Sequence, residues 1–451
     1  MNPNIFREYD IRGLAEKDFD EEFSRLLGKV HGTTISEQGG KRVAVGRDYR
    51  PTSDRYANGV IEGLRSAGLH VYDLGICPTP HLYFSLFHLN LDGGVQITAS
   101  HNTSEYNGFK VCVGKDTLFG SQIQELRTKM ETGNFRERSG GKSESYAIIP
   151  IYEEHILRDI PALERPLKVV LDAGSGVAGP VAPPIARQLG CTVWEIACVP
   201  DGTFPIHHPD PTIPENLKDL INKVREEKAD LGIAYDGDGD RIGVVDEYGN
   251  ILWGDELLVL FSREILKTHP GAVIISEVKC SQRLFDDISL HGGVPIMWKA
   301  GHSLIKAKMK ETGAVLAGEM SGHMFFADRY FGYDDAIYAS MRLLQLLAQA
   351  GRPLSTLLSD LPKTVSTPEI RIDCPDDLKF TLTEKAKEYF RKHYEVIDVD
   401  GVRVQFPEGW GLVRASNTQP ALVLRFEAKT PTQLKQYREI IEGKLHELQK
   451  N

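Results

Sequence analysis

The chain has 451 residues, of which 41% are hydrophobic and 26% are charged, and its formal net charge is −10 at pH 7. This length predicts several domains, and the composition is that of a globular protein rather than a disordered one. The acidic chain shows no basic patch, which argues against nucleic acid as a partner. A small phosphorylated molecule is not excluded, because a few Arg and Lys side chains can focus an anion into an acidic protein.

The sequence shows no sign of a membrane partner or of secretion. Its longest apolar runs, such as residues 257–261, are far too short to cross a bilayer, and residues 1–7 lack the order of a signal peptide. Six cysteines are scattered along the chain, and no pair has metal-ligand spacing. A chain of this size needs no disulfides, so we expect a cytoplasmic protein with reduced cysteines.

Strands and helices alternate through most of the sequence. A strand at residues 42–46 precedes a helix near 53–67, a strand at 168–172 precedes a helix near 180–189, and residues 272–276 open a third unit in the same way. Each opening strand leads to a later strand that ends in a polar or glycine-rich loop. We therefore expect one α/β unit used three times, with its ligands at these strand-end loops.

The C-terminal segment has a different pattern. Strands are predicted at 369–374, 411–414 and 421–426, helices at 378–393 and 432–448, and a hairpin with strands 396–399 and 402–406 around Asp400-Gly401. This pattern is typical of an α+β domain with a mostly antiparallel sheet. The predicted domains are 1–146, 147–250, 251–362 and 363–451, with a glycine-rich stretch at 140–143 and Pro362 supporting two of the boundaries.

Two of the strand-end loops carry groups that suit phosphoryl transfer. Residues 98–102 (Thr-Ala-Ser-His-Asn) place the Ser100 hydroxyl in a short polar loop after an apolar strand. Residues 236–241 carry carboxylates at alternate positions, in Asp236, Asp238 and Asp240. Three such carboxylates can converge on one hard cation, and oxygen ligands of this kind suit Mg²⁺. A serine beside a magnesium ion indicates phosphoryl transfer through a phosphoserine.

Each of these motifs also has a plainer interpretation. Ser-His-Asn after a strand is most often only a turn, since Ser and Asn bond their own backbone. The three aspartates fill the first, third and fifth positions of an EF-hand calcium loop, and Glu247 falls at its twelfth. However, the sixth position, which needs glycine, is Arg241, and the flanking segments have the pattern of strands. A calcium-dependent binding module is therefore the weaker alternative.

Further segments offer ligands for a phosphorylated sugar. Residues 414–419 combine a guanidinium, hydroxyls and an amide, which suit a phosphate monoester, although the same composition suits a hairpin loop. Glu319 and Ser321 can bond sugar hydroxyls, or can belong to a plain turn. Arg12 adds a second guanidinium near the N-terminus, where such a charge is usually solvated.

Together these loops resemble those of the α-D-phosphohexomutases. The resemblance covers essentially the whole chain, and its motifs occur in the family's order: a phosphoserine loop at 98–102, a metal loop at 236–241, a sugar loop at 319–323 and a phosphate loop at 414–419. The sugar loop, Glu-Met-Ser-Gly-His, is most similar to the bacterial phosphomannomutase/phosphoglucomutase branch, because phosphoglucosamine mutases more often have Gln where Met320 stands. One departure is Thr103, where many members carry proline.

The resemblance implies a fold and a reaction. It implies four domains around a central cleft, the first three of them α/β with mixed sheets. It also implies that a phosphoryl group on Ser100 passes to the 1- or 6-phosphate of mannose and/or glucose, and that the bound 1,6-bisphosphate turns round and returns its other phosphate. Hexose 1,6-bisphosphate is then the activator and one Mg²⁺ per chain the metal. A phosphoglucosamine mutase and a phosphoserine-using sugar phosphatase stay as alternatives, and the oligomeric state stays open.

The resemblance also assigns roles to individual residues. The expected catalytic residues are Ser100, His101, Lys110, Arg12, Arg241 and His323. The expected substrate-binding residues are Tyr9, Lys279, His302, Glu319, Ser321, Arg414, Ser416, Asn417 and Thr418. The expected metal ligands are Ser100, Asp236, Asp238 and Asp240.

Overall fold

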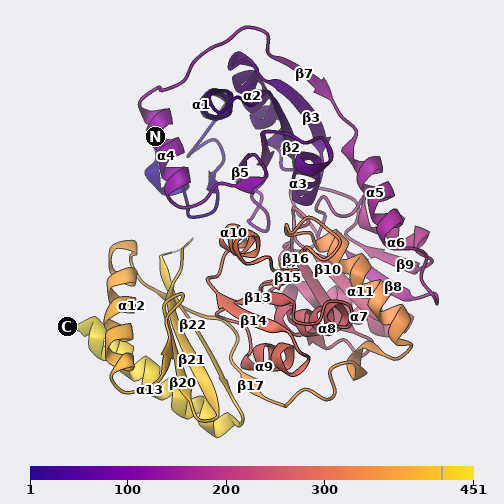
Figure 1. Ribbon diagram of the computed structural model, residues 1–451, viewed down its shortest axis with the longest axis vertical. Helices are drawn as coiled ribbons and strands as arrows, with labels where there is room; N and C mark the ends of the chain where they lie inside the picture. Colours follow the sequence, from indigo (N-terminus) through magenta and orange to yellow (C-terminus); the bar gives the residue numbers. More distant parts are fainter. Residues whose placement is uncertain (418–419, 451) are drawn as a thin grey trace.

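The computed structural model describes residues 1–417 and 420–450, which fold around four β-sheets (Figure 1). The first sheet contains β1 (Ile11–Leu14), β2 (Arg42–Arg47), β3 (His70–Ile76), β4 (Gly93–Ile97), β5 (Tyr106–Val113), β6 (Asp116–Thr117) and β7 (Lys142–Ser145). The second contains β8 (Lys168–Asp172), β9 (Thr192–Ile196), β10 (Leu231–Tyr235), β11 (Ile242–Asp246) and β12 (Ile251–Leu252). The third contains β13 (Val273–Glu277), β14 (Val294–Trp298), β15 (Leu316–Gly318) and β16 (Met324–Phe326).

Helices connect and cover these three sheets. Those of the first unit are α1 (Glu21–Glu37), α2 (Ser53–Ser66), α3 (Thr79–His88) and α4 (Ser121–Glu131). Those that follow are α5 (Ile148–Asp159), α6 (Ala182–Gln188), α7 (Lys218–Glu227), α8 (Gly254–Leu266), α9 (Gln282–Leu290), α10 (His302–Thr312) and α11 (Ala336–Ala350). Local signals set where several of them begin. The side chains of Asp20 and Asp335 cap α1 and α11, because each accepts a hydrogen bond from a backbone N–H in the first turn.

The first three sheets share one strand order. It runs β5–β4–β2–β3 in the first sheet, β11–β10–β8–β9 in the second and β16–β15–β13–β14 in the third. In each, the opening strand lies between two parallel neighbours, and one of these turns back into an antiparallel strand. The expectation of one α/β unit used three times, with mixed sheets, is confirmed.

This repeated order explains why three motifs of different composition serve one site. Residues 98–105 join β4 to β5, residues 236–241 join β10 to β11, and residues 319–323 join β15 to β16. Each loop thus occupies the same place in its own sheet, at the carboxyl end of a strand with a parallel neighbour. Ligands bind at this end of open α/β sheets.

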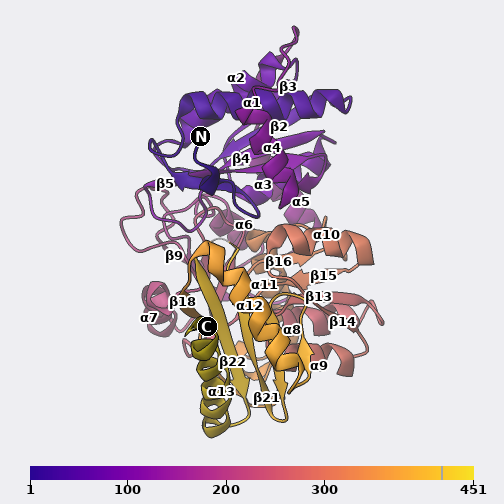
Figure 2. The same cartoon turned by 90° about the vertical axis from the view of Figure 1, so that its left-hand side faces the viewer.

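The C-terminal unit is antiparallel, as expected. Its strands are β17 (Val365–Ser366), β18 (Ile370–Asp373), β19 (Val396–Ile397), β20 (Val402–Phe406), β21 (Gly409–Ala415) and β22 (Ala421–Ala428). Helices α12 (Asp376–Arg391) and α13 (Pro431–Lys450) lie on one face of this sheet (Figure 2). The predicted hairpin is present, but β19 ends at Ile397 rather than at residue 399. Ile397 is paired with Arg403, so residues 398–402 form the connection, and within it Asp400 bonds Arg414 and the backbone N–H of Ala300.

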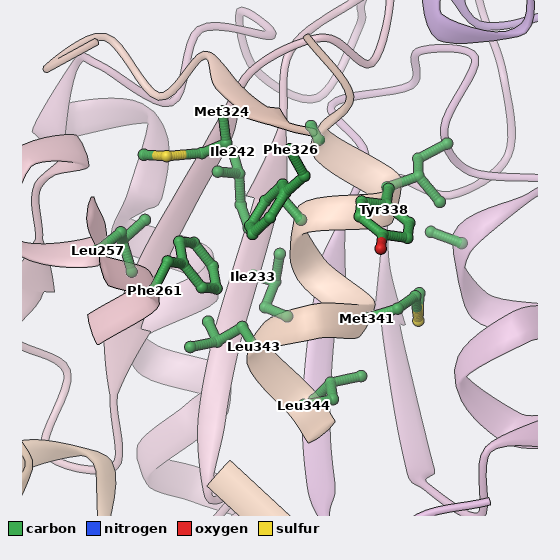
Figure 3. Close-up of a cluster of buried hydrophobic side chains, with 14 of the residues drawn as sticks. Ile233, Ile242, Leu257, Phe261, Met324, Phe326, Tyr338, Met341, Leu343 and Leu344 are labelled. Carbon is green, nitrogen blue, oxygen red and sulfur yellow. The ribbon is translucent and has the colours of Figure 1, made fainter. Parts of the chain in front are cut away.

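One buried cluster joins the second and third sheets (Figure 3). Helix α11 lies across both sheets, and its Tyr338 packs with Phe326 of β16, close to Ile233 and Ile242 of the second sheet. The backbone N–H of Ile242 donates to the carbonyl of Gly322 at 3.1 Å. The shared core therefore fixes the position of the metal loop relative to the sugar loop, because close-packed interiors deform little.

The predicted domain boundaries stay predictions. Each sheet draws its strands from one predicted range, except that β12 follows the boundary at 250 and pairs with β11. Within the part of the chain that the structure describes, no helix has the length and apolar character needed to cross a membrane.

Candidate active site

The Ser100 loop meets the metal loop directly. Ser100 is 2% exposed and has φ +50°, in the left-handed region that few residues other than glycine adopt. Its Oγ donates a hydrogen bond to Asp236 Oδ2 at 2.6 Å and lies 3.1 Å from His101 Nδ1. The two motifs are thus in contact although 136 positions separate Ser100 from Asp236 in the sequence.

The three aspartates form a buried carboxylate cluster. Ligand oxygens of Asp236, Asp238 and Asp240 lie within 4.8 Å of one another, and all three side chains are buried. Burial and the two neighbouring carboxylates hold the pKa of Asp236 well above its ordinary value. Oδ1 of Asp238 and Oδ1 of Asp240 have no hydrogen-bond partner. Because orphaned buried oxygens are costly, this donor set fits a hard divalent cation.

The same geometry argues against an EF-hand. Strands β10 and β11 flank the loop where an EF-hand has helices. Glu247 bonds the backbone N–H and the hydroxyl of Ser355, beyond the far end of β11. It is therefore engaged away from the aspartates.

Lys110 provides a positive charge inside this cluster. It lies on β5, opposite Gln96 of β4, and its Nζ is 2.7 Å from Asp238 Oδ2 and also contacts Asp240. Burial alone would lower the pKa of Lys110, but the two carboxylates raise it above its ordinary value. Thr79, at the start of α3, donates to the same oxygen of Asp238 at 2.6 Å.

His323 connects the sugar loop to the metal loop. Its Nε2 lies 2.9 Å from Arg241 Nε, which can only donate, so Nε2 accepts and Nδ1 carries the proton. Nδ1 lies 3.2 Å from Asp334 Oδ2. Asp334 also contacts His302 Nδ1 at 3.5 Å and Lys306 Nζ at 3.0 Å. Burial alone would raise the pKa of Asp334, but Lys306 and the two neighbouring imidazoles hold it well below its ordinary value.

Tyr9 joins three of the four units. Its hydroxyl donates to the carbonyl of Ala300 at 2.7 Å and accepts from Asn417 Nδ2 at 2.6 Å. Gly301 has φ +131°, and a Cβ there would lie 2.4 Å from Tyr9 Cζ, so only glycine fits beneath the ring. Nearby, Arg12 donates from Nη1 to Asn102 Oδ1 at 2.8 Å and thereby contacts the Ser100 loop.

The remaining predicted residues occupy the third and C-terminal units. Glu319 Oε1 accepts from the N–H of Gly301 at 2.8 Å. Lys279 Nζ lies 3.2 Å from Glu369 Oε2, across the boundary between these units. Arg414 Nε donates to Asp400 Oδ2 at 3.0 Å.

Three further predicted residues belong to the sugar loop and to the segment after β21. Ser321 is half-buried in the sugar loop, and the backbone N–H of Ser416 bonds the carbonyl of Ala421. Thr418 lies outside the described residues.

Four family models match the chain, and they follow one another along it. They are described as Phosphoglucomutase/phosphomannomutase alpha/beta/alpha domains I, II and III and the C-terminal domain, and they match residues 3–137, 151–249, 253–365 and 369–444. The chain belongs to the phosphoglucomutase/phosphomannomutase family. Members of this family are isomerases, and the chain is accordingly an enzyme of that class.

Relatives match the chain over its whole length. A phosphomannomutase/phosphoglucomutase of Pseudomonas aeruginosa is 48% identical, with 98% of this chain and 95% of the relative covered. A phosphoglucomutase of Neisseria gonorrhoeae is 43% identical, with 98% of each chain covered. The crystal structure of a family member from Burkholderia thailandensis superposes with a TM-score of 0.94 at 43% identity, covering 100% of this chain and 98% of that one.

Sequence reasoning missed several residues that organise the site of this phosphoglucomutase/phosphomannomutase family member. Asp334 and Asp400 hold predicted residues in place, and Arg50 binds the Ser100 loop from behind. The sequence offered a weak signal for Arg50, because it follows Asp48 at the end of a buried strand. Asp334 and Asp400 had no such signal, since their partners lie in other secondary-structure elements or loops.

A further histidine, His207, holds the segment beside the metal loop. Its Nε2 lies 3.0 Å from both carboxylate oxygens of Asp172, at the end of β8. This hydrogen bond outweighs the effect of burial and raises the pKa of His207 to about 9. Two residues on, Pro209 Cγ lies 3.3 Å from the point that a Cβ of Gly237 would occupy in the metal loop.

We expect the stabilisation from His207 to disappear at alkaline pH. The pKa is about 6.5 in the unfolded chain and about 9 in the folded one, so the contribution is complete below pH 6.5 and is lost as the pH rises through 9. In urea unfolding, His207→Gln should lower the free energy of unfolding by about 1–3 kcal/mol more at pH 6 than at pH 10. The exposed-site variant His393→Gln is the control. If the free energy of unfolding of His207→Gln stays below that of the wild type by the same amount across this pH range, the assignment is wrong.

Proposed function

We propose that this protein interconverts the 1- and 6-phosphates of mannose and/or glucose, through a phosphoserine on Ser100 and a bound hexose 1,6-bisphosphate. The observation that carries the proposal is the contact between Ser100 Oγ and a buried carboxylate cluster with two orphaned oxygens. The names of the relatives support both sugars, because the Pseudomonas aeruginosa protein is named for mannose and glucose and the Neisseria gonorrhoeae protein for glucose alone.

The metal in this proposal is Mg²⁺. Asp236, Asp238 and Asp240 would hold it together with the oxygen of Ser100 or of its phosphoryl group. When bound, the ion would neutralise charge on the transferred phosphoryl group. Buried all-oxygen ligands suit Mg²⁺ better than metals that prefer nitrogen or sulfur.

The chain's own residues handle the proton and the charge at Ser100. When Ser100 attacks the bisphosphate, its Oγ forms a bond to phosphorus and loses its proton, while the bond from phosphorus to the sugar oxygen breaks and that oxygen takes up a proton to become a hydroxyl. His101 Nδ1 and Asp236 Oδ2 are within reach of the Ser100 proton, at 3.1 and 2.6 Å from Oγ. Burial and the nearby cations Arg241 and Arg12 hold the pKa of His101 well below its ordinary value, so its imidazole is neutral and able to accept.

Residues of the other loops would hold the sugar and its second phosphate. Glu319 and Ser321 would bond sugar hydroxyls common to both orientations, while Lys279, His302 and Tyr9 would line the sugar. Lys110, Arg12, Arg241 and His323 would surround the reacting group, and Arg414, Ser416, Asn417 and Thr418 would hold the phosphate that is not reacting. The bond between Tyr9 and Asn417 supports a site that closes over its substrate. Closure excludes water, which favours a mutase over a phosphatase.

The test is a set of coupled assays on mannose, glucose and glucosamine 1-phosphates, each with the corresponding bisphosphate as activator. We expect 6-phosphate formation from mannose 1-phosphate, glucose 1-phosphate or both, with little release of inorganic phosphate. Turnover of glucosamine 1-phosphate alone would instead establish a phosphoglucosamine mutase. Inorganic phosphate as the main product would establish a phosphatase.

The proposed role of Arg414 in holding the phosphate that is not reacting, here called the phosphate clamp, can be tested by substitution. Arg414→Ala removes a charged phosphate contact worth about 1.5–3 kcal/mol, so kcat/KM should fall roughly ten- to a hundredfold. The variant should also release more free bisphosphate per turnover, because the lost contact would retain the intermediate while it turns. Labelled glucose 1-phosphate measures this release. The surface variant Arg438→Ala, in the same unit, is the control. Unchanged kcat/KM together with unchanged release would exclude the clamp.

A further inference from the structure

Arg50 binds the back of the Ser100 loop with both Nη groups of its guanidinium. It stands between β2 and α2, and its side chain is buried. A guanidinium has five N–H donors, and each of them is used here. The acceptors are Asp48 Oδ2 at 3.1 Å and the backbone carbonyls of Thr103 at 2.5 Å, Tyr106 at 3.0 Å, Ser100 at 2.8 Å and Asn102 at 2.5 Å.

The loop needs such a partner because its backbone is strained at the nucleophile. Ser100 is held at φ +50°, a conformation that persists only where the surrounding structure enforces it. Three carbonyls of this loop, including that of Ser100 itself, converge on Arg50 together with the carbonyl of Tyr106 at the start of β5. Charge-assisted hydrogen bonds of this kind are stronger and geometrically stricter than neutral ones.

Arg50 is itself fixed from two sides. Asp48 accepts from Arg50 Nε and, at 2.5 Å, from the hydroxyl of Ser53. The ring of Phe204, from the second unit, lies 5.0 Å from the guanidinium carbon of Arg50. At Gly202 a Cβ would lie 2.0 Å from the carbonyl of Tyr49, so the covering segment is packed tightly against this point. Arg50 is thus enclosed by protein, and its donors are already used.

We infer that Arg50 is a positioning residue for phosphoryl transfer: it holds Ser100 in its left-handed conformation beside the carboxylate cluster. This inference rests on the proposed phosphoserine mechanism. Arg50 acts through the loop rather than through the substrate, because its five donors all bond protein acceptors. Lysine cannot replace it, since an ammonium has three donors on one nitrogen and cannot reach five separated acceptors.

The variant Arg50→Lys should therefore affect rate rather than binding. A misplacement of about 1 Å at a reacting group can reduce a rate about a hundredfold. We expect kcat per folded molecule to fall roughly ten- to a hundredfold while KM changes less than about threefold. Transfer of label from phosphorylated Ser100 to glucose 1-phosphate in a single turnover should slow by the same factor. A purely structural role would lower the melting temperature but leave both rates unchanged.

Two further variants make this test decisive. Arg47→Lys changes a neighbouring arginine that pairs with Asp73 and Asp54 outside the loop, and it should transfer label at the wild-type rate. Asp48→Asn keeps Arg50 but weakens its anchor, and it should slow transfer in the same direction by a smaller factor. Asp48→Asn provides the test if Arg50→Lys does not fold.

Wild-type transfer rates in folded Arg50→Lys, or in Asp48→Asn, would overturn the positioning role. A rise in KM without a fall in kcat would do the same. Failure of the wild-type protein to carry label on Ser100 would instead reject the proposed function.

Discussion

Ser100→Ala is expected to lower mutase turnover by more than about a thousandfold, because it removes the oxygen that accepts the phosphoryl group. The fold should persist. Alanine can occupy the same backbone conformation, and the lost hydrogen bond to Asp236 contributes only about 1 kcal/mol. Turnover is measured in the coupled assay, and covalent phosphate on the intact protein by mass spectrometry. We expect phosphate on the wild-type protein after incubation with bisphosphate, and none on the variant.

The matched control is Ser104→Ala, which removes a hydroxyl from the same loop without touching the cluster. It should keep its turnover and its covalent phosphate. Turnover of a folded Ser100→Ala protein near the wild-type level would reject the phosphoserine mechanism outright. Phosphate found on Ser104 or elsewhere would reassign the nucleophile.

Removal of divalent metal is expected to abolish activity, and Mg²⁺ should restore it. Without a cation the carboxylate cluster lacks the charge needed to stabilise the transferred group, whereas Zn²⁺ should bind yet inhibit, because it prefers tetrahedral geometry. The binding of Mg²⁺ can also be measured without an activity assay. At about one hundred times its Kd, a ligand stabilises the folded protein by about 2.7 kcal/mol, so Mg²⁺ should raise the melting temperature of the chelator-treated protein.

In Asp238→Asn, Mg²⁺ should neither restore activity nor raise the melting temperature, since the substitution replaces one ligand of the cluster with a neutral amide. Asp219→Asn, an exposed position on α7, serves as its control and should respond to Mg²⁺ as the wild type does. Full activity after exhaustive chelation would contradict the metal assignment. A melting temperature of Asp238→Asn that still rises with Mg²⁺ would place the ion elsewhere.

The sequence alone predicted the elements and the loops because their signals are local. An apolar run followed by Ser100, or by alternating aspartates, marks the end of a buried strand before a polar turn, and both were found there. The threefold use of one unit followed from the same pattern. The length of β19 was not predicted correctly, because a hairpin signal at Asp400-Gly401 marks a turn but not the number of residues in it, and here residues 398–402 lie outside the pairing of β19 with β20.

Only the tertiary structure decided which charges meet. Lys110 reaches the carboxylates of Asp238 and Asp240 because β5 lies beside β4, whose following loop meets the metal loop. Asp334 organises the site through helix α10 and the sugar loop, so no periodicity or spacing marks it in the sequence. The short spacing from Asp48 is only a weak signal for Arg50, because the carbonyls that Arg50 binds lie about 50 positions further along the chain. Residue patterns report burial and turns along one segment, whereas hydrogen bonds and ion pairs between distant segments exist only once the sheets have packed.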